Sequence, residues 1–283
     1  MNNRPASECL LLSWFHDTTV WKGTIMKEFF IDSDGIPLHA KLEMPEGNAE
    51  RCPLCIVQHG LTGHMEENHI VAVAQALREE GIATLRVEMY GHGKSGGSFG
   101  KHTLLKWVNN MLDVIDYAKA LPFVTDLYLC GHSQGGFLTM MMGALRPDDL
   151  KAIIPMSPAI VIVDNARAGV LFGMTFDPVH VPDRIYLGNP GLAEDGTEAP
   201  SFCGDYFRVA QHIDVDDVIK SYDGPVLLVH GTDDLAVPVQ YSIDAAKKYA
   251  NAKLVLLEGD DHNYHAHLDQ ACAAVKEFVR SLG

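Results

Sequence analysis

The stretch Gly131-His132-Ser133-Gln134-Gly135 decides the fold of this chain. It follows the apolar run 127–130, which is typical of a buried strand, and precedes the apolar run 137–145, which is typical of a packed helix. The two glycines allow the chain to turn sharply and allow strand and helix to approach closely. We therefore expect Ser133 at the tip of a strained strand-to-helix turn, where a nucleophilic serine would be exposed.

A serine of this kind needs two partners further along the chain. Its hydroxyl is a weak nucleophile at neutral pH and depends on a base within hydrogen-bond reach and on an acid that orients this base. The strand-like run 225–230 leads into a loop with two aspartates, and the strand-like run 253–258 leads to a histidine. The sequence thus predicts nucleophile, acid and base in that order, each just past the carboxyl end of a strand.

We assign Ser133 as the nucleophile, His262 as the general base and Asp234 as the acid. The neighbouring Asp233 is the alternative, and Asp234 is preferred for its spacing to Val237-Pro238. The tetrahedral oxyanion of acyl transfer also needs two hydrogen-bond donors. The backbone N–H of Gln134 supplies one, and the glycine-rich loop 59–63 offers the N–H of Leu61 as the other. The alternative interpretation of this loop is an ordinary strand-to-helix turn.

The remainder of the chain alternates between strands and helices. An Asp-Gly turn joins the strand-like segments 26–32 and 36–44 into an antiparallel pair. Further strands are expected at 54–58, 82–87 and 151–156, and amphipathic helices at 65–80, 104–121 and 266–282. Such alternation implies parallel crossovers and a sheet covered by helices on both faces, which is the α/β class.

The regular pattern is interrupted between Pro158 and about Tyr222. Four prolines in this segment break any long helix, and an irregular segment of this length inside a compact domain is usually a lid over a site. We therefore expect a core formed by residues 26–157 and 223–283, with residues 158–222 inserted as a cap. Residues 1–25 are expected to be a loose extension or the result of an upstream start of translation, and we expect no signal peptide in them.

Composition narrows the range of partners. The 283 residues carry a net charge of −15 and no cluster of Lys and Arg, which weighs against nucleic acid and against an anionic membrane surface. No apolar stretch reaches the ~20 residues needed to cross a bilayer. Six cysteines are too few for a disulfide scaffold in a chain of this length, so we expect a soluble protein of the reducing cytoplasm. Cys52 and Cys55 have the spacing of half a zinc site but suit a strand better, so neither a metal nor a cofactor is expected.

With these motifs in order, the chain resembles the α/β-hydrolase family and, within it, the bacterial cinnamoyl or feruloyl esterases. The resemblance rests on the triad, the His-Gly-Leu-Thr-Gly loop at 59–63 and the Gly-His-Gly-Lys-Ser loop at 91–95. The segments 176–184 and 205–211 add to it, because they resemble parts of the small cap of those esterases. It implies a serine esterase whose substrate is a small-molecule ester of a hydroxycinnamic acid, and it leaves a homodimer open.

In such esterases, a cap aspartate and a cap tyrosine bind the ring hydroxyl of the substrate. The resemblance carries these roles to Asp164 and Tyr206, with a solvated cap surface as the alternative interpretation of both. The segment 187–202 is longer than the usual cap, which affects the shape of the pocket. Rival functions of the same fold are a monoacylglycerol lipase, a thioesterase and a carbon–carbon bond hydrolase. A non-enzymatic binding protein of this fold usually lacks a member of the triad, and here all three are present.

Overall fold

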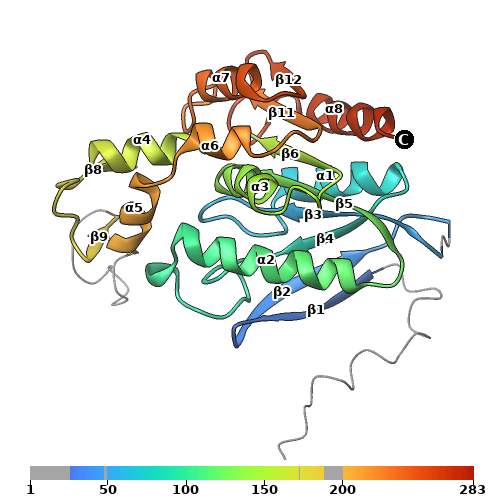
Figure 1. Cartoon of the computed structure of the whole chain (residues 1–283), viewed down its shortest axis with the longest axis horizontal. Coiled ribbons are helices and arrows are strands. Elements are labelled where there is room, and N and C mark those ends of the chain that lie inside the picture. The colour runs from blue at the N-terminus through green and yellow to red at the C-terminus, as the bar shows by residue number, and fades with distance from the viewer. Residues whose placement is uncertain (1–25, 48–49, 172, 188–199) are drawn as a thin grey trace, which may run out of the picture.

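The computed structural model describes residues 26–47, 50–171, 173–187 and 200–283, so the predictions for 1–25 and for most of 187–202 lie outside the described residues. Eight strands form one sheet in the order β1-β2-β4-β3-β5-β6-β11-β12 (Figure 1). The strands are β1 Met26–Ser33, β2 Ile36–Glu43, β3 Cys52–Gln58, β4 Ala83–Val87, β5 Val124–His132, β6 Ala152–Met156, β11 Val226–Gly231 and β12 Ala252–Leu257. From β4 to β12 the neighbouring strands are parallel, whereas β2 runs antiparallel to both of its neighbours.

Sequence explains the two kinds of strand. The central strands β3, β4 and β6 are apolar runs and are buried almost throughout, as expected where helices cover both faces of a parallel sheet. The pair β1 and β2 is closed by Asp34 and Gly35, both at positive φ (52° and 77°), as an Asp-Gly hairpin turn requires. The predicted α/β architecture is therefore present, with strand boundaries close to the expected ones.

Helices pack on both faces of the sheet. Helices α1 (Asn68–Glu79) and α8 (Leu268–Ser281) share one apolar layer, and α2 (Leu104–Ala120) and α3 (Gln134–Leu145) share the other. Helix α2 begins after Thr103, whose side chain accepts a hydrogen bond from the N–H of Lys106, as a favourable N-cap does. Helix α7 (Gln240–Lys248), for which the pattern gave no range, occupies the crossover between β11 and β12. No helix in the described ranges is long and apolar enough to span a membrane.

The segment 158–222, expected to be irregular because of its prolines, contains more secondary structure than predicted. Between β6 and β11 the described residues form three short helices, α4 (Val161–Ala168), α5 (Gly204–Gln211) and α6 (Val215–Lys220). Two small sheets accompany them, one of β7 (Val170–Leu171) with β8 (Met174–Thr175) and one of β9 (Arg184–Tyr186) with β10 (Ser201–Cys203). The prolines do not prevent these helices, because α4 lies between Pro158 and Pro178, and α5 and α6 both lie between Pro200 and Pro225. In Figure 1, α4, α5, β8 and β9 lie together at one end of the molecule, beside the sheet.

Candidate active site

Ser133 occupies a strained turn between β5 and α3. Its backbone has φ 57° and ψ −120°, a conformation that L side chains rarely adopt. The Ser133 N–H donates to the carbonyl of Met156 at 2.9 Å, and the Ser133 carbonyl accepts from the N–H of Ala159 at 2.9 Å. These bonds attach the turn to β6 and to the start of the insertion, so the surrounding fold maintains the strain.

The two glycines of the turn allow close approach. A Cβ atom on Gly131 would lie 2.2 Å from the carbonyl oxygen of Gly135, and one on Gly135 would lie 2.4 Å from that of His59. Both distances are far below van der Waals contact, so any side chain would force the strand, the helix and the loop after β3 apart.

His262 and Asp234 form the second part of the site. Nδ1 of His262 lies 2.6 Å from Oδ2 of Asp234 and donates to it, which leaves Nε2 free for a proton from the nucleophile. Ser133 and His262 both line the same cavity. Asp233 does not share this contact; its N–H donates to the carbonyl of Asp260 at 2.9 Å.

The carboxylate of Asp234 is almost fully hydrogen-bonded. Its Oδ1 accepts from the N–H groups of Ala236 and Val237, both at 2.8 Å, and its Oδ2 accepts from Nε2 of His230 at 3.0 Å. Burial alone would raise the pKa of Asp234, but the hydrogen bonds from His230 and His262 outweigh it and hold this pKa well below its usual range. Asp234 is therefore a fixed anion beside the imidazole.

Two buried histidines, His132 and His69, support the backbone of the loop that carries His262. Nε2 of His132 donates to the backbone carbonyl of His262 at 2.7 Å, and Nδ1 of His132 lies 3.1 Å from Nε2 of His69. Because Nε2 of His132 must carry the proton, its Nδ1 accepts and His69 donates. Burial lowers the pKa of both side chains, that of His69 to about 4, so both stay neutral. The backbone of His262 is thus linked through His132 to helix α1.

The loop after β3 brings Leu61 to the cavity, and hydrogen bonds fix the residues on both sides of Leu61. Nδ1 of His59 donates to the Gly60 carbonyl at 2.7 Å. The N–H of Thr62, which has φ 62°, donates to Nε2 of His92 at 3.3 Å. Leu61 lines the cavity beside Ser133 and Gln134. Gln134 is the first residue of α3, where backbone N–H groups lack a partner within the helix. Leu61 and Gln134, the residues expected to supply the oxyanion donors, therefore line one cavity.

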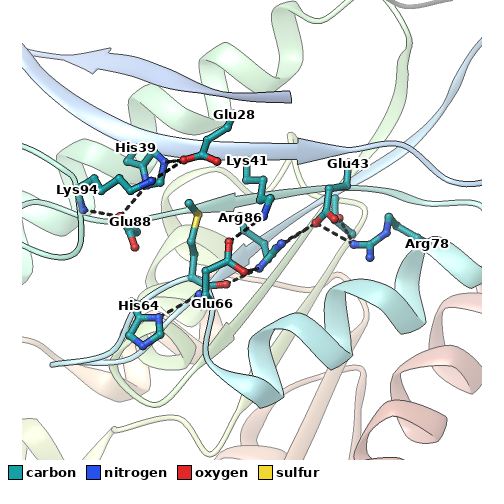
Figure 2. Close-up of polar contacts among 12 residues, drawn as sticks. Glu28, His39, Lys41, Glu43, His64, Glu66, Arg78, Arg86, Glu88 and Lys94 are labelled. Atoms are coloured by element: carbon teal, nitrogen blue, oxygen red, sulfur yellow. Dashed lines mark hydrogen bonds and ion pairs between the residues drawn. The ribbon is translucent and has the colours of Figure 1, made fainter. Parts of the chain in front are cut away.

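Partly buried ion pairs support this loop and the loop 91–95 from the side of β2 and β4. Figure 2 shows the Arg86 guanidinium between the carboxylates of Glu43 and Glu66, and Arg86 also donates to the carbonyl of Met65 at 2.6 Å. Arg86 is only 2% exposed, so it acts as an internal brace for the chain after Leu61.

A second cluster in Figure 2 braces the loop 91–95. The imidazole of His39 lies between Glu28 and Glu88, at 2.6 Å and 2.8 Å. Glu88 in turn accepts a hydrogen bond from the Lys94 N–H at 2.6 Å. Because His92 belongs to this loop, the cluster positions the side chain that holds Thr62.

The cavity beside Ser133 has a volume of about 400 Å³ and an uneven lining. Apolar side chains from the insertion, Val161, Ile162 and Leu171, contribute to one part of it, together with Val237 from the Asp234 loop. Its polar groups include Asn165. The cavity thus combines apolar and polar groups beside Ser133.

Asp164 lies elsewhere, contrary to the expectation from the resemblance. It lines a different hollow on the other side of α4, where its carboxylate accepts a hydrogen bond from the Tyr241 hydroxyl at 2.7 Å. Consecutive residues of an α-helix point about 100° apart, so the neighbouring Asn165 faces the cavity instead. The sequence alone could not distinguish Asp164 from Asn165, because it does not show which face of α4 turns toward the cavity.

Tyr206 also differs from its expected place. It is fully buried on α5 and is not among the described residues that line the cavity. Its hydroxyl donates to Oε1 of Gln134 at 2.8 Å, so it connects the insertion to the turn after Ser133. Gln134 is among the residues that line the cavity, and its side-chain Nε2 is buried without a hydrogen-bond partner within the described part of the chain.

Sequence reasoning missed several residues that contact or line the candidate site. His69, His230 and Asn165 stand in patterns typical of ordinary helices and strands, so nothing local singled them out. Cys52 and Cys55, by contrast, lie buried in β3 as expected. Burial raises the pKa of both thiols.

Two family models match the chain. The model described as "Serine aminopeptidase, S33" matches residues 49–185, and the model described as "TAP-like protein" matches residues 194–282. The solved structure of Est1E from Butyrivibrio proteoclasticus with bound ferulic acid is 50% identical, with a TM-score of 0.84 over 90% of this chain and 98% of that chain. The chain belongs to the α/β-hydrolase family. Within that family it is similar to Est1E.

Curated relatives are more distant. Palmitoyl-protein thioesterase ABHD10 of Mus musculus is 24% identical over 77% of this chain and 72% of the relative. A monoacylglycerol lipase of Mycolicibacterium smegmatis is 25% identical over 62% of this chain and 56% of the relative. Both similarities agree with the fold.

Proposed function

We propose that this protein is a serine carboxylesterase that hydrolyses esters of hydroxycinnamic acids through an acyl-enzyme. The observation that carries this function is the 50% identity to Est1E, whose solved structure holds ferulic acid. The cavity beside Ser133 supports it, because its lining is apolar along the insertion and carries an amide at Asn165.

In the proposed reaction, Ser133 attacks the ester carbonyl while Nε2 of His262 takes the hydroxyl proton. Asp234 holds the imidazole in the reactive tautomer and stabilises its cation. The N–H groups of Leu61 and Gln134 stabilise the oxyanion of the tetrahedral intermediate. His262 then donates its proton to the leaving alcohol, and water cleaves the acyl-enzyme by the same steps in reverse.

The acyl group is proposed to lie between Val161, Ile162, Leu171 and Val237. An aromatic ring is flat and apolar, and these aliphatic side chains provide matching contacts. Asn165 is proposed to hydrogen-bond a ring hydroxyl, since an amide can both donate and accept. This role replaces the one that the resemblance gave to Asp164 and Tyr206.

The test is hydrolysis of methyl caffeate, methyl ferulate, methyl cinnamate and p-nitrophenyl esters of increasing chain length. We expect the highest kcat/KM with the hydroxylated cinnamates, and Asn165→Ala should raise KM for methyl caffeate more than for methyl cinnamate, which has no ring hydroxyl. Ser133→Ala should lower kcat by about 10⁴-fold or more while the far-ultraviolet circular dichroism is unchanged.

Other outcomes would select a different function. Activity confined to long aliphatic esters would favour the lipase named among the relatives, and activity confined to acyl thioesters would favour the thioesterase. Near-normal turnover by Ser133→Ala would contradict the nucleophile.

We also propose that the enzyme works in the cytoplasm. The five cysteines in the described part of the chain are free thiols, and Cys55 and Cys130 are fully buried. Cell fractionation tests this location, and recovery of the enzyme only from the culture medium would contradict it.

A further inference from the structure

The cavity beside Ser133 contains a carboxylate that the proposed reaction does not use. Glu67, the N-cap residue of α1, lines the cavity together with Ser133 and His262. Its Oε2 accepts a hydrogen bond from the backbone N–H of His64 at 3.2 Å. A Cβ atom on Gly63 would lie 2.3 Å from the same oxygen, so the carboxylate rests directly against the Gly63 backbone. The donor loop thus fixes the carboxylate in place.

Glu67 shares the cavity with His262, and helix α1, which begins after Glu67, is linked to the His262 loop through His69 and His132. Burial raises the pKa of its carboxyl, whereas the hydrogen bond from His64 and the charges of His64 and His262 act to lower this pKa. Geometry places the two residues in one neighbourhood, because His69, two residues after Glu67, lies 3.1 Å from His132, and the rings of His132 and His262 are 4.6 Å apart between centroids. Asn263, the residue after His262, also lines the cavity.

The position beside His262 determines which half of the ester Glu67 meets. The apolar lining residues Val161, Ile162 and Leu171 come from the insertion and suit the acyl group. His262 delivers its proton to the oxygen of the leaving alcohol, so the groups nearest to the imidazole face the alcohol. Besides aliphatic groups of the Asp234 loop, the described lining here includes the carboxylate of Glu67 and the amide of Asn263.

We propose that Glu67 selects the alcohol half of the ester by its charge. The enzyme prefers esters of neutral, hydroxyl-rich alcohols such as sugars, whose hydroxyls can donate to Glu67, and discriminates against alcohols that carry a carboxylate, such as quinate. The like charges of Glu67 and such an alcohol repel each other within a partly buried cavity, where screening is weaker than in bulk water. This inference rests on the proposed function.

The experiment uses three esters that share the caffeoyl group: methyl caffeate, 5-O-caffeoylquinate and the methyl ester of 5-O-caffeoylquinate. The last two differ essentially by one negative charge. At about pH 8, where carboxyl groups are ionised, we expect the wild-type kcat/KM to favour the neutral ester by about five- to tenfold. Glu67→Gln should bring this ratio close to one. Added salt of about 0.5 M should reduce the ratio measured for the wild-type enzyme, and this test does not depend on a variant.

Asp164→Asn is the matched control. It removes the same unit of charge from an exposed side chain that lines a different hollow, so it should leave the ratio at the wild-type value. A ratio unchanged by Glu67→Gln, or one changed equally by Asp164→Asn, would overturn the role of Glu67.

Methyl caffeate separates this inference from the proposed function. If the wild-type enzyme does not hydrolyse methyl caffeate, the proposed function is wrong and the inference is lost with it. If methyl caffeate is hydrolysed but both quinate esters react equally well at low salt, the esterase assignment stands and the inference alone is wrong.

Discussion

Single residues provide the charges and donors of the site, and their neighbours fix where these groups point. The Asp234 carboxylate accepts four hydrogen bonds, from Ala236, Val237, His230 and His262. Such a saturated carboxylate cannot turn away from the imidazole. A similar principle applies to the backbone of His262, which is held by His132.

We expect the hydrogen bond from His132 to the His262 carbonyl to position the general base. His132→Gln keeps a donor near the position of Nε2, whereas His132→Asn places its amide near Nδ1 and loses the bond. Because a displacement of about 1 Å can cost on the order of 10²-fold in rate, kcat should fall about 10- to 100-fold in His132→Asn and much less in His132→Gln. KM should change little in both.

Two measurements separate positioning from a general loss of stability. Each variant loses one of the two hydrogen bonds of His132, the one to His262 in His132→Asn and the one from His69 in His132→Gln, so both should unfold at lower denaturant concentration than the wild type. Only His132→Asn should also react slowly with phenylmethylsulfonyl fluoride, which reports the reactivity of Ser133. Equal losses of kcat in the two variants would rule out a positioning role.

At the scale of elements, the insertion is joined to the core by a few specific contacts. One of them runs from Tyr206 on α5 to Gln134 on α3. Helices α4 and α5 otherwise share an apolar cluster with Leu104 of α2 and Val237 of the Asp234 loop. The shape of the proposed acyl pocket therefore depends on how α4 and α5 pack on the core.

Tyr206→Phe should lower the free energy of unfolding by about 1–3 kcal/mol, because the Gln134 amide oxygen would be left buried without its donor. Tyr249→Phe is the control, since the Tyr249 hydroxyl is buried without a partner in the described part of the chain. That change should be neutral or stabilising. Urea denaturation measures both, and equal effects of the two variants would contradict the account of Tyr206.

At the scale of the whole molecule, buried neutral histidines make stability depend on pH. Burial lowers the pKa of His59 to about 3 and those of His69 and His102 to about 4, from 6.5. Unfolding releases these side chains to water, where they bind protons below their usual pKa. The native state is therefore fully favoured above pH 6.5 and loses stability as the pH falls toward these lowered values.

We expect the free energy of unfolding to fall between pH 6.5 and pH 4 by up to about 1.4 kcal/mol per pH unit for each such histidine. Denaturation curves at several pH values measure this slope, and replacing His102 by Gln should reduce it. A stability that stays constant over this range would contradict the buried neutral state of these histidines.

Much of the chemistry could be predicted from the sequence by itself. The turn around Ser133, the succession of strands along the chain and the loops with Asp234 and His262 are local patterns. They can be recognised because glycine content and apolar periodicity are visible within a few residues. These patterns were sufficient to predict the α/β sheet and to indicate a serine-based acyl transfer.

Only the tertiary structure decided which side chains face the cavity. Asn165 lines it and Asp164 does not, because adjacent residues on α4 point in different directions and only packing determines which one faces inward. Tyr206 binds Gln134, and His69 supports His132 across 63 residues of sequence. Such contacts depend on where distant segments meet in space, which no local pattern records.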